Sequence, residues 1–361
     1  MSEIFDYFSG NYAQARRAFR EAAASAGAAL GAHHNPATGP GGIELSTETA
    51  RLGPQEAERL LVVMSGTHGV ECFCGSGLQV GLLKSGLATE MPRGTAILLI
   101  HAINPSGFAW VRRVTEDNVD LNRNFVDHAR PHPINAAYDE LREAICPRDW
   151  INGQAAADAA LEAYRQRHGA MALQGAITSG QYGDPEGVFY GGRAPVWSNR
   201  TLREILRREG AHVRHAAFID LHTGLGPYGV GEIMNNHHPG HSGFARVKDW
   251  FGAEATSSDE GSSSSAPVGG DTNIALDDEL PQAAVTGITL EYGTLPVKAM
   301  LDSIRADNWL HVHGSLDSPE GRAIKARIRQ AFYPDKNDWR RMVWERVVDV
   351  TRRMAKGLAE S

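Results

Sequence analysis

The sequence predicts an α/β fold in which a mostly parallel or mixed central sheet carries helices on both faces. Short continuous apolar runs, typical of strands buried on both faces, occur at 60–64 and 95–101, and the segments 213–221 and 285–291 are further predicted strands. Longer segments with helical spacing separate these runs, as in chains that alternate strands and helices. In such a sheet, a functional site is expected where loops leave the carboxyl ends of the strands.

The N-terminal elements follow from local composition. The Ala- and Arg-rich segment from Asn11 to about Leu30 contains no proline and predicts a helix, ended by the Gly-rich stretch 31–42. Alternating apolar and polar residues at 43–52 indicate an edge strand in an antiparallel pairing. After the strand at 60–64, we expect the Gly75-Ser76-Gly77 cluster to open a helix that runs to about Leu87.

The remaining elements alternate in the same way. Helical patterns span 138–175 and 197–210, and Gly210 stands where a helix would end. The segment 232–235 is a further short strand, and the Ser-, Gly- and Asp-rich segment 256–272 indicates a mobile surface loop. Three helices are expected near the C-terminus, at about 297–311, 319–332 and 338–358.

Composition narrows the class of protein. The chain has 361 residues and a formal net charge of -7, which gives no reason to expect nucleic acid or an anionic membrane as a partner. Its three cysteines do not form a disulfide framework, and the N-terminus lacks the pattern of a signal peptide. No apolar run approaches the roughly 18 residues that a membrane span needs. We therefore expect a cytoplasmic protein of enzyme size.

The most informative segment is the run 61–71, where an apolar strand ends in Ser-Gly-Thr and is followed by His68 and Glu71. In a tight turn that leaves a strand, an imidazole and a carboxylate three residues apart can converge on one point. Both are good zinc ligands, and a catalytic zinc usually takes three protein ligands and one water. His-x-x-Glu also arises often by chance, so the pair needs a third ligand before a metal site is favoured over a structural role.

Other polar groups stand at predicted strand or loop ends. The strand at 213–221 is followed by His222-Thr223-Gly224, and Glu291 ends the strand at 285–291. A further polar cluster, Asp120-Leu121-Asn122-Arg123-Asn124-Phe125, lies between Glu71 and His222 in the sequence and follows the Asn104-Pro105 loop. Each of these clusters contains a residue type that a zinc hydrolase requires.

This ordered set resembles the zinc carboxypeptidase superfamily, which includes the digestive carboxypeptidases, bacterial murein peptide amidases, and the aspartoacylase and succinylglutamate desuccinylase branch. The order His-x-x-Glu, Asn-Pro, Asp-x-Asn-Arg, His, Glu covers about residues 60 to 295. The resemblance implies one zinc-hydrolase domain over 1–361, with a catalytic core at about 40–315 and a helical C-terminal extension at about 316–361. The chain looks similar to bacterial-type branches of the superfamily without an assigned substrate.

The resemblance also implies roles for individual residues. His68, Glu71 and His222 would hold one Zn²⁺ per chain, and Glu291 would be the general base that passes a proton to the leaving group. Asn122 and Arg123 would grip a substrate carboxylate, with an Arg fork suited to bidentate binding. Arg113 would stabilise the oxyanion, although its neighbour Arg112 fits the same spacing within one residue. Asp120 would orient the first histidine ligand, and Asp220 could act similarly on His222.

Several features depart from the superfamily pattern. Digestive carboxypeptidases carry a mobile tyrosine between the last histidine and the glutamate, whereas here Tyr228 is the only tyrosine in that interval and lies much nearer the histidine. Cys72 and Cys74 could offer thiolates to a metal, but their spacing favours small buried residues. The cluster of His237, His238 and His241 is interpreted as a lid or pocket rim rather than a second metal site.

The leading hypothesis is a zinc-dependent hydrolase of an amide bond next to a carboxylate, acting on a peptide in the manner of a metallocarboxypeptidase. One alternative is a deacylase of small N-acyl amino acids, as in the aspartoacylase-like branch, and another is an esterase or lactonase. A hypothesis of a different class is a non-catalytic metal-binding protein on the same fold, since fold alone does not determine function. We expect residues 125–200 and 256–272 to form the walls of the substrate pocket. A homo-oligomer is compatible with the sequence. The composition of these segments does not identify the substrate.

Overall fold

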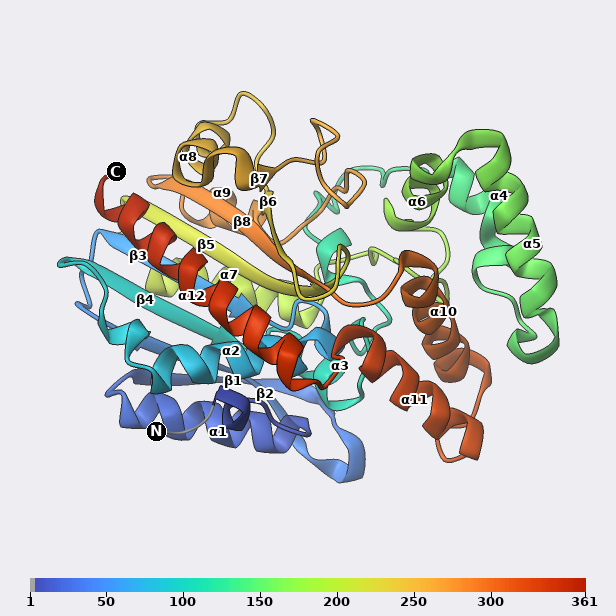
Figure 1. Cartoon of the computed structure of the whole chain (residues 1–361), viewed down its shortest axis with the longest axis horizontal. Coiled ribbons are helices and arrows are strands. Elements are labelled where there is room, and N and C mark those ends of the chain that lie inside the picture. Colours follow the sequence, from blue (N-terminus) through green and yellow to red (C-terminus); the bar gives the residue numbers. More distant parts are fainter. Residues whose placement is uncertain (1–3) are drawn as a thin grey trace.

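The computed structural model describes residues 4–361, and a mixed eight-stranded sheet forms its centre (Figure 1). In chain order, the strands are β1 (Ala29–Thr38), β2 (Glu44–Leu52), β3 (Arg59–Ser65), β4 (Thr95–His101), β5 (His215–Gly224), β6 (Gly231–Asn235), β7 (Ala255–Thr256) and β8 (Ala284–Gly293). Across the sheet they follow the order β1-β2-β4-β3-β5-β8-β6-β7. The four central strands β4, β3, β5 and β8 are parallel, whereas β2 and β6 pair with them in the antiparallel sense. The predicted α/β class with a mixed sheet is confirmed.

The central strands are buried on both faces because alternate side chains enter two different cores. In β3, Leu61 and Val63 face one core, and Leu60 and Val62 face the other. The first core is covered by helices α1 (Tyr12–Ser25), α2 (Cys72–Lys84) and α12 (Asn337–Ala359), and the second by α7 (Trp197–Glu209) and α9 (Ile274–Glu279). The apolar runs in the sequence therefore correspond to strands whose side chains are buried on both faces of the sheet.

The helix after the first central strand begins earlier than expected. It starts at Cys72, so the cluster Gly75-Ser76-Gly77 lies inside α2 rather than at its beginning. A Cβ on Gly75 would stand 2.6 Å from Ser65 Cβ, and one on Gly77 would stand 2.3 Å from the Phe8 ring. These glycines permit close packing of α2 on its neighbours, a tertiary requirement that overrides their low helix propensity.

The N-terminal edge of the sheet also differs from expectation. The first helix ends at Ser25, and Gly27 with φ 75° turns the chain into β1, which occupies part of the stretch expected to be irregular. The strand expected at the edge, β2, instead lies between β1 and β4. Because most side chains of β1 are exposed or half-buried, the strand carries no apolar alternation that the sequence could reveal.

The other predicted strands and helices are confirmed with boundaries that differ by a few residues, except that the helical segment expected at 138–175 is divided into three helices, described below. Besides β3 to β6, β8 and α7, the confirmed elements include the C-terminal helices α10 (Val297–His313), α11 (Pro319–Phe332) and α12. Helix α12 packs on β3 and β5, so part of the C-terminal segment covers the sheet itself. Three short helices were not predicted: α3 (Pro105–Ala109), α8 (Ser242–Phe251) and α9. Among the described residues, no helix has the length and apolar content needed to cross a membrane.

A group of three helices stands beside α10, away from the sheet (Figure 1). It consists of α4 (Ala136–Ile145), α5 (Trp150–His168) and α6 (Ala170–Thr178), called here the helical lobe. Arg305 of α10 joins it to the rest of the chain. Its guanidinium donates to the Ala144 and Ile145 carbonyls at 2.7 and 3.0 Å and pairs with Asp158 at 2.7 Å.

We predict that Arg305→Ala destabilises the protein by about 3 kcal/mol or more, because it leaves two buried lobe carbonyls without their side-chain donor and removes one of the cations paired with Asp302 and Asp158. Urea unfolding followed by circular dichroism measures this change. Arg142→Ala is the matched control, because Arg142 of α4 forms only an exposed pair with Asp139. An equal effect of the two substitutions would contradict the role assigned to Arg305.

Candidate functional site

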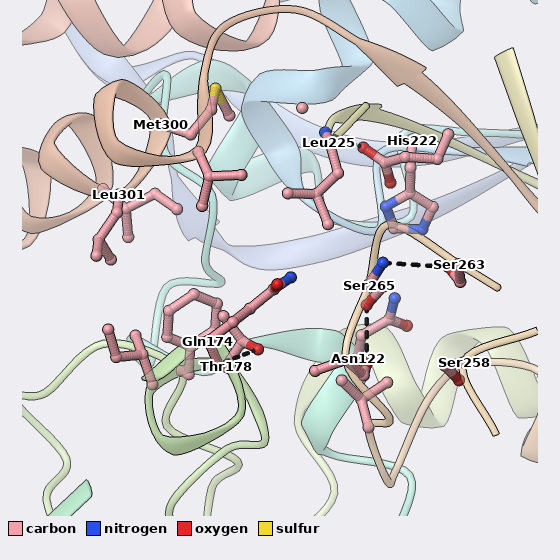
Figure 2. A pocket seen from close by; sticks show the side chains of 18 of the residues that line it. Asn122, Gln174, Thr178, His222, Leu225, Ser258, Ser263, Ser265, Met300 and Leu301 are labelled. Atoms are coloured by element: carbon pink, nitrogen blue, oxygen red, sulfur yellow. Dashed lines mark hydrogen bonds between the residues drawn. The ribbon is translucent and has the colours of Figure 1, made fainter. Parts of the chain in front are cut away.

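The candidate site lies at the carboxyl ends of three parallel strands, β3, β5 and β8, where a cavity opens between the sheet and the helical lobe (Figure 2). His222 of β5 lies directly beside Glu291 of β8 in the strand register. His68 and Glu71 follow β3, and their turn ends in a one-turn 3-10 helix at Gly69–Glu71. Parallel pairing brings these ends to one edge because parallel strands share a direction.

The turn after β3 is held in place by the segment that carries the arginines. The backbone N–H groups of Gly69 and Val70 donate to the carbonyls of Arg113 and Arg112 at 3.0 and 2.7 Å. Gly69 approaches this segment so closely that a Cβ would stand 2.0 Å from the Gly107 carbonyl carbon. The glycine therefore allows the turn to lie on residues 107–113, which fixes where His68 and Glu71 point.

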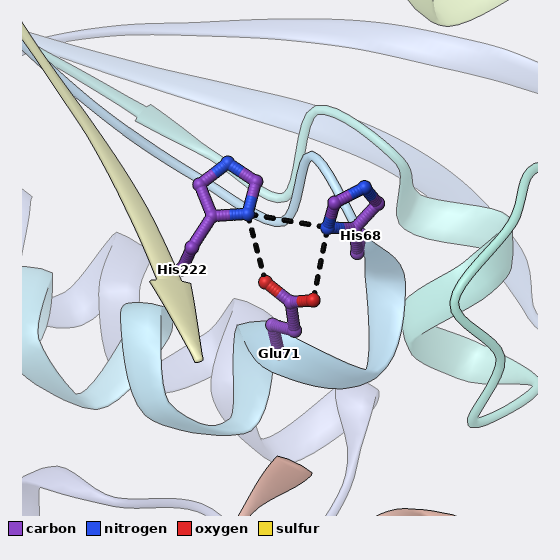
Figure 3. Close-up of side chains that lie close together, drawn as sticks. All are labelled: His68, Glu71 and His222. Carbon is purple, nitrogen blue, oxygen red and sulfur yellow. Dashed lines mark hydrogen bonds and ion pairs between the residues drawn. The ribbon is translucent and has the colours of Figure 1, made fainter. Parts of the chain in front are cut away.

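The structure brings His68, Glu71 and His222 together in one buried cluster (Figure 3). The two Glu71 carboxylate oxygens lie 2.9 Å from His68 Nδ1 and 2.9 Å from His222 Nδ1, respectively. The two Nδ1 atoms lie 3.1 Å apart. Three ligand atoms thus face a common point, although His68 and His222 are 154 positions apart in the chain.

Two further carboxylates hold the imidazole rings from behind. His68 Nε2 lies 3.1 Å from Asp120 Oδ1, and His222 Nε2 lies 2.9 Å from Asp220 Oδ2. Thr67 and Thr272 donate their hydroxyls to Asp220 at 2.9 Å, so that carboxylate is itself fixed. A carboxylate behind each ring favours the proton on Nε2 and leaves the Nδ1 lone pair for the centre of the cluster.

This arrangement fits a metal cation. With both rings neutral and protonated on Nε2, two nitrogen lone pairs and a carboxylate converge at hydrogen-bonding distance with no proton between them, and a cation at the centre removes that repulsion. Burial opposes charge here, yet Asp220 and Glu71 raise the pKa of His222 well above its usual value, so the carboxylates favour a positive charge at this point, supplied either by a proton or by a metal cation. Despite burial, the two imidazoles lower the pKa of Glu71. The donor set of two imidazoles and one carboxylate is one that zinc accepts.

Arg113 connects the cluster to its supporting carboxylate. Its Nη1 donates to Glu71 at 3.1 Å and its Nε to Asp120 at 3.2 Å, and it lines the cavity. Arg112 points elsewhere: it donates to Asn118 at 2.9 Å, contacts Asp307 at 3.4 Å, and is not among the cavity-lining residues. Between the two adjacent arginines, the structure thus places Arg113, and not Arg112, at the site.

Glu291 lies at the edge of the cluster and lines the cavity. The backbone N–H of Leu225 donates to its Oε1 at 2.8 Å, which fixes one of its two oxygens. Burial, together with the nearby Glu71 carboxylate, raises the pKa of Glu291 to about 8. This side chain therefore binds a proton far more readily than an exposed glutamate.

Asn122 and Arg123 also line the cavity, and several of their polar atoms already have partners. Arg123 donates from Nε to the Thr178 carbonyl at 2.9 Å and from Nη1 to the Asn122 carbonyl at 2.8 Å. Asn122 Oδ1 accepts from the Thr272 backbone N–H at 3.2 Å. The Arg123 guanidinium thus borders the cavity and also binds the C-terminal end of α6. The sequence did not predict this second contact.

The cavity has a volume of about 570 Å³, within the range of roughly 300–1,000 Å³ found for ligand sites. Its walls include the expected segments 125–200 and 256–272. They also include His237 and His238, in agreement with the pocket rim expected for the histidine cluster, whereas His241 does not line the cavity. The first turns of α10 and the end of β6 at 234–236 were not predicted as walls, because their contribution depends on how α10 and β6 pack.

The second histidine cluster has a different character. His237, His241 and Asp277 offer ligand atoms near one another, and the two rings are stacked with centroids 4.4 Å apart. However, His237 Nε2 accepts from the Gly287 N–H at 2.8 Å, and His241 Nδ1 accepts from the Gly243 N–H at 3.1 Å. In each ring, one nitrogen therefore accepts a hydrogen bond from a backbone N–H. When the ring is neutral, its second nitrogen carries the proton and has no lone pair for a metal. His237 and His238 line the cavity.

Two other features of the sequence do not contribute atoms to the ligand cluster. Cys72 and Cys74 are buried inside α2, and burial raises the pKa of the Cys72 thiol to about 12, so it stays protonated. Tyr228 is partly exposed, its hydroxyl lies 3.3 Å from the Asp338 carboxylate, and it is not among the cavity-lining residues.

Comparison with solved structures finds several similar chains at low sequence identity. Bovine thrombin-activatable fibrinolysis inhibitor, solved in complex with tick carboxypeptidase inhibitor, is 12% identical, with 92% of this chain and 100% of that chain covered and a TM-score of 0.44. Succinylglutamate desuccinylase from Chromobacterium violaceum is 15% identical over 89% and 75% of the two chains, with a TM-score of 0.38. An aspartoacylase family protein from Mesorhizobium loti is 15% identical over 78% and 66%, with a TM-score of 0.37.

Comparison with curated proteins finds no significant match. A family model described as "Protein of unknown function (DUF2817)" matches residues 8–346, which is nearly the whole chain and includes every residue of the candidate site. The chain therefore belongs to the DUF2817 family.

Proposed function

We propose that this protein is a zinc-dependent hydrolase that cleaves an amide bond next to a carboxylate. The observation that supports this most directly is the buried convergence of His68, Glu71 and His222 at the edge of a cavity, with Glu291 beside them. A Zn²⁺ ion bound by these three residues would polarise the substrate carbonyl and lower the pKa of a water molecule toward roughly 7.

In this proposal, the chain's own residues orient the reactants and move the proton. Glu291 takes a proton from the attacking water and delivers it to the leaving nitrogen, while the Leu225 N–H holds one of its oxygens in position. Arg113 faces the cavity and has N–H groups beyond those that bind Glu71 and Asp120, and these would donate to the developing oxyanion.

Asp120 and Asp220 do not touch the substrate in this proposal. They keep Nδ1 of His68 and His222 directed at the centre of the cluster through their contacts with the two Nε2 atoms. Asn122 and Arg123 border the cavity where a substrate carboxylate would bind. For Arg123 this requires either N–H groups not used by Thr178 or an exchange of that contact on binding.

The purified protein is predicted to hold about one zinc per chain, measured by inductively coupled plasma mass spectrometry, because the three ligand atoms converge with support from Asp120 and Asp220. His68→Ala and His222→Ala should lose this metal, whereas His241→Ala should retain it because a backbone N–H occupies one of its ring nitrogens. Loss of zinc only in His241→Ala would move the metal site to the second histidine cluster.

Glu291→Gln is predicted to reduce kcat about 10²–10⁴-fold, since an amide cannot accept the proton, while the zinc content stays unchanged. Glu279→Gln, on α9 and paired with Arg203, is the matched control and should leave kcat unchanged. A screen of peptides, N-acyl amino acids and esters provides the substrate. If Glu291→Gln turns over such a substrate at the native rate, the glutamate has no part in the mechanism.

Arg123→Ala is predicted to raise KM at least tenfold for substrates that end in a carboxylate, because a charge-assisted hydrogen bond is lost. The same substrates with an amidated end should be affected much less. Because Arg123 also holds the Thr178 carbonyl, the unfolding midpoint is measured alongside. An equal increase in KM for the carboxylate and the amidated substrates would show that Arg123 only stabilises α6 and does not bind the substrate carboxylate.

A further inference from the structure

The cavity beside the cluster has two walls of different chemistry. The helical wall, formed by α5, α6 and α10, presents the apolar side chains of Leu161, Leu173, Ile177, Met300, Leu301 and Ile304. The opposite wall is formed largely by the segment 257–268 and contains several serines. Figure 2 shows Met300 and Leu301 on one side of the cavity and Ser258, Ser263 and Ser265 on the other.

Charged residues of the helical wall are engaged with one another. Asp158 accepts from Arg305 at 2.7 Å and from Lys298 at 2.9 Å, and Lys298 also pairs with Asp302 at 2.8 Å. Glu162 pairs with Arg165 of the same helix at 2.6 Å. A ligand on this side would therefore meet mainly hydrocarbon, because the nearby charges already satisfy each other.

The two walls are joined across the cavity. Gln174 of α6 donates from Nε2 to the Ser264 carbonyl at 3.1 Å, although the two residues are 90 positions apart. This contact bounds the space between the helical lobe and the serine-rich segment. A ligand group that enters between α6 and α10 is thus surrounded by protein rather than lying on an open surface, and enclosure increases the apolar area removed from water.

The size of the cavity exceeds the needs of a small polar acyl group. A volume of about 570 Å³ lies within the range that accepts drug-sized ligands, far above what an acetyl group occupies. Burial of apolar ligand surface contributes roughly 25 cal/mol per Å², so an extended apolar group would gain affinity along the helical wall that a small group could not.

We infer that the natural substrate is an amide carrying an extended apolar group, which lies between α6 and α10 while its polar end faces the serine-rich segment 257–268. This inference rests on the proposed function. In the hydrolysis, the C–N bond breaks, the hydroxyl of water joins the acyl carbon, and its hydrogen joins the nitrogen. The apolar group could belong to the acyl part or to the amine part, and the shared requirement is its size and lack of charge.

Two substrate series separate these sources. In the first, N-acyl alanines carry acetyl, octanoyl or dodecanoyl groups; in the second, N-acetyl dipeptides end in alanine, leucine or phenylalanine. Measured with the zinc-loaded protein, kcat/KM should rise at least tenfold from the smallest to the largest apolar group in one series. Equal values along both series would overturn the inference and leave the hydrolase function standing.

Binding is measured independently of turnover. Calorimetry with zinc-loaded Glu291→Gln should give at least tenfold tighter binding of the largest member than of the smallest in one of the two series. Equal or weaker binding of the largest members would reject the apolar substrate. Tighter binding without hydrolysis of either series by the native protein would support the apolar site and count against the proposed function.

Variants place the apolar group on the helical wall. Leu173→Gln on α6 and Leu301→Gln on α10 line the cavity and are half-buried, so both should lower kcat/KM for the preferred long substrate roughly tenfold while changing the acetyl substrate less than about twofold. Met171→Gln is the matched control, because Met171 is 55% exposed on the same helix and does not line the cavity. Equal losses for long and short substrates, or the same loss in the control, would overturn the placement.

Discussion

The Glu71 carboxylate lies between two imidazole nitrogens in a site that has almost no contact with water. A buried charge of this kind is stable only when it is paired and hydrogen-bonded, and the surrounding residues meet that requirement in layers. Arg113 donates to Glu71 and to Asp120, Asp120 contacts His68, and Asp220 contacts His222. The positions of the turn after β3, the arginine segment and the end of β5 all depend on this network.

The network also explains why a cation suits its centre. Among the described residues, the carboxylates of Glu71, Asp120, Asp220 and Glu291 share this site with the guanidinium groups of Arg113 and Arg123. The excess of negative charge is reflected in the pKa of Glu291, which burial and Glu71 raise to about 8. A divalent cation between the imidazoles would offset this excess, in keeping with the way that ligand sets for structural and catalytic metals couple to nearby pKa values.

The cavity beside the cluster is bordered by a part of the chain that lies outside the sheet. The helical lobe packs beside α10 through the buried Arg305, and Gln174 connects it to the serine-rich segment. The lobe forms one wall of the cavity, whereas the strand ends form its floor. This division separates the groups proposed to perform chemistry from the groups proposed to select the substrate, as is common where loops and insertions decorate a rigid sheet.

The sequence by itself determined the elements and residues that carry strong local signals. The apolar runs at 60–64 and 95–101 predicted central strands because a strand buried on both faces is apolar at every position. His68, Glu71, His222 and Glu291 were identified because each follows or ends such a strand, and parallel strands bring their carboxyl ends together.

Only the tertiary structure decided the features that depend on packing between distant segments. Whether Arg112 or Arg113 reaches Glu71 depends on how residues 107–113 lie against the turn at Gly69, and the two arginines are equivalent in spacing alone. No local sequence pattern predicted the edge strand β1, the glycines inside α2 or the apolar cavity wall on α10. Their roles follow from close approach and burial, which are set by contacts far apart in sequence.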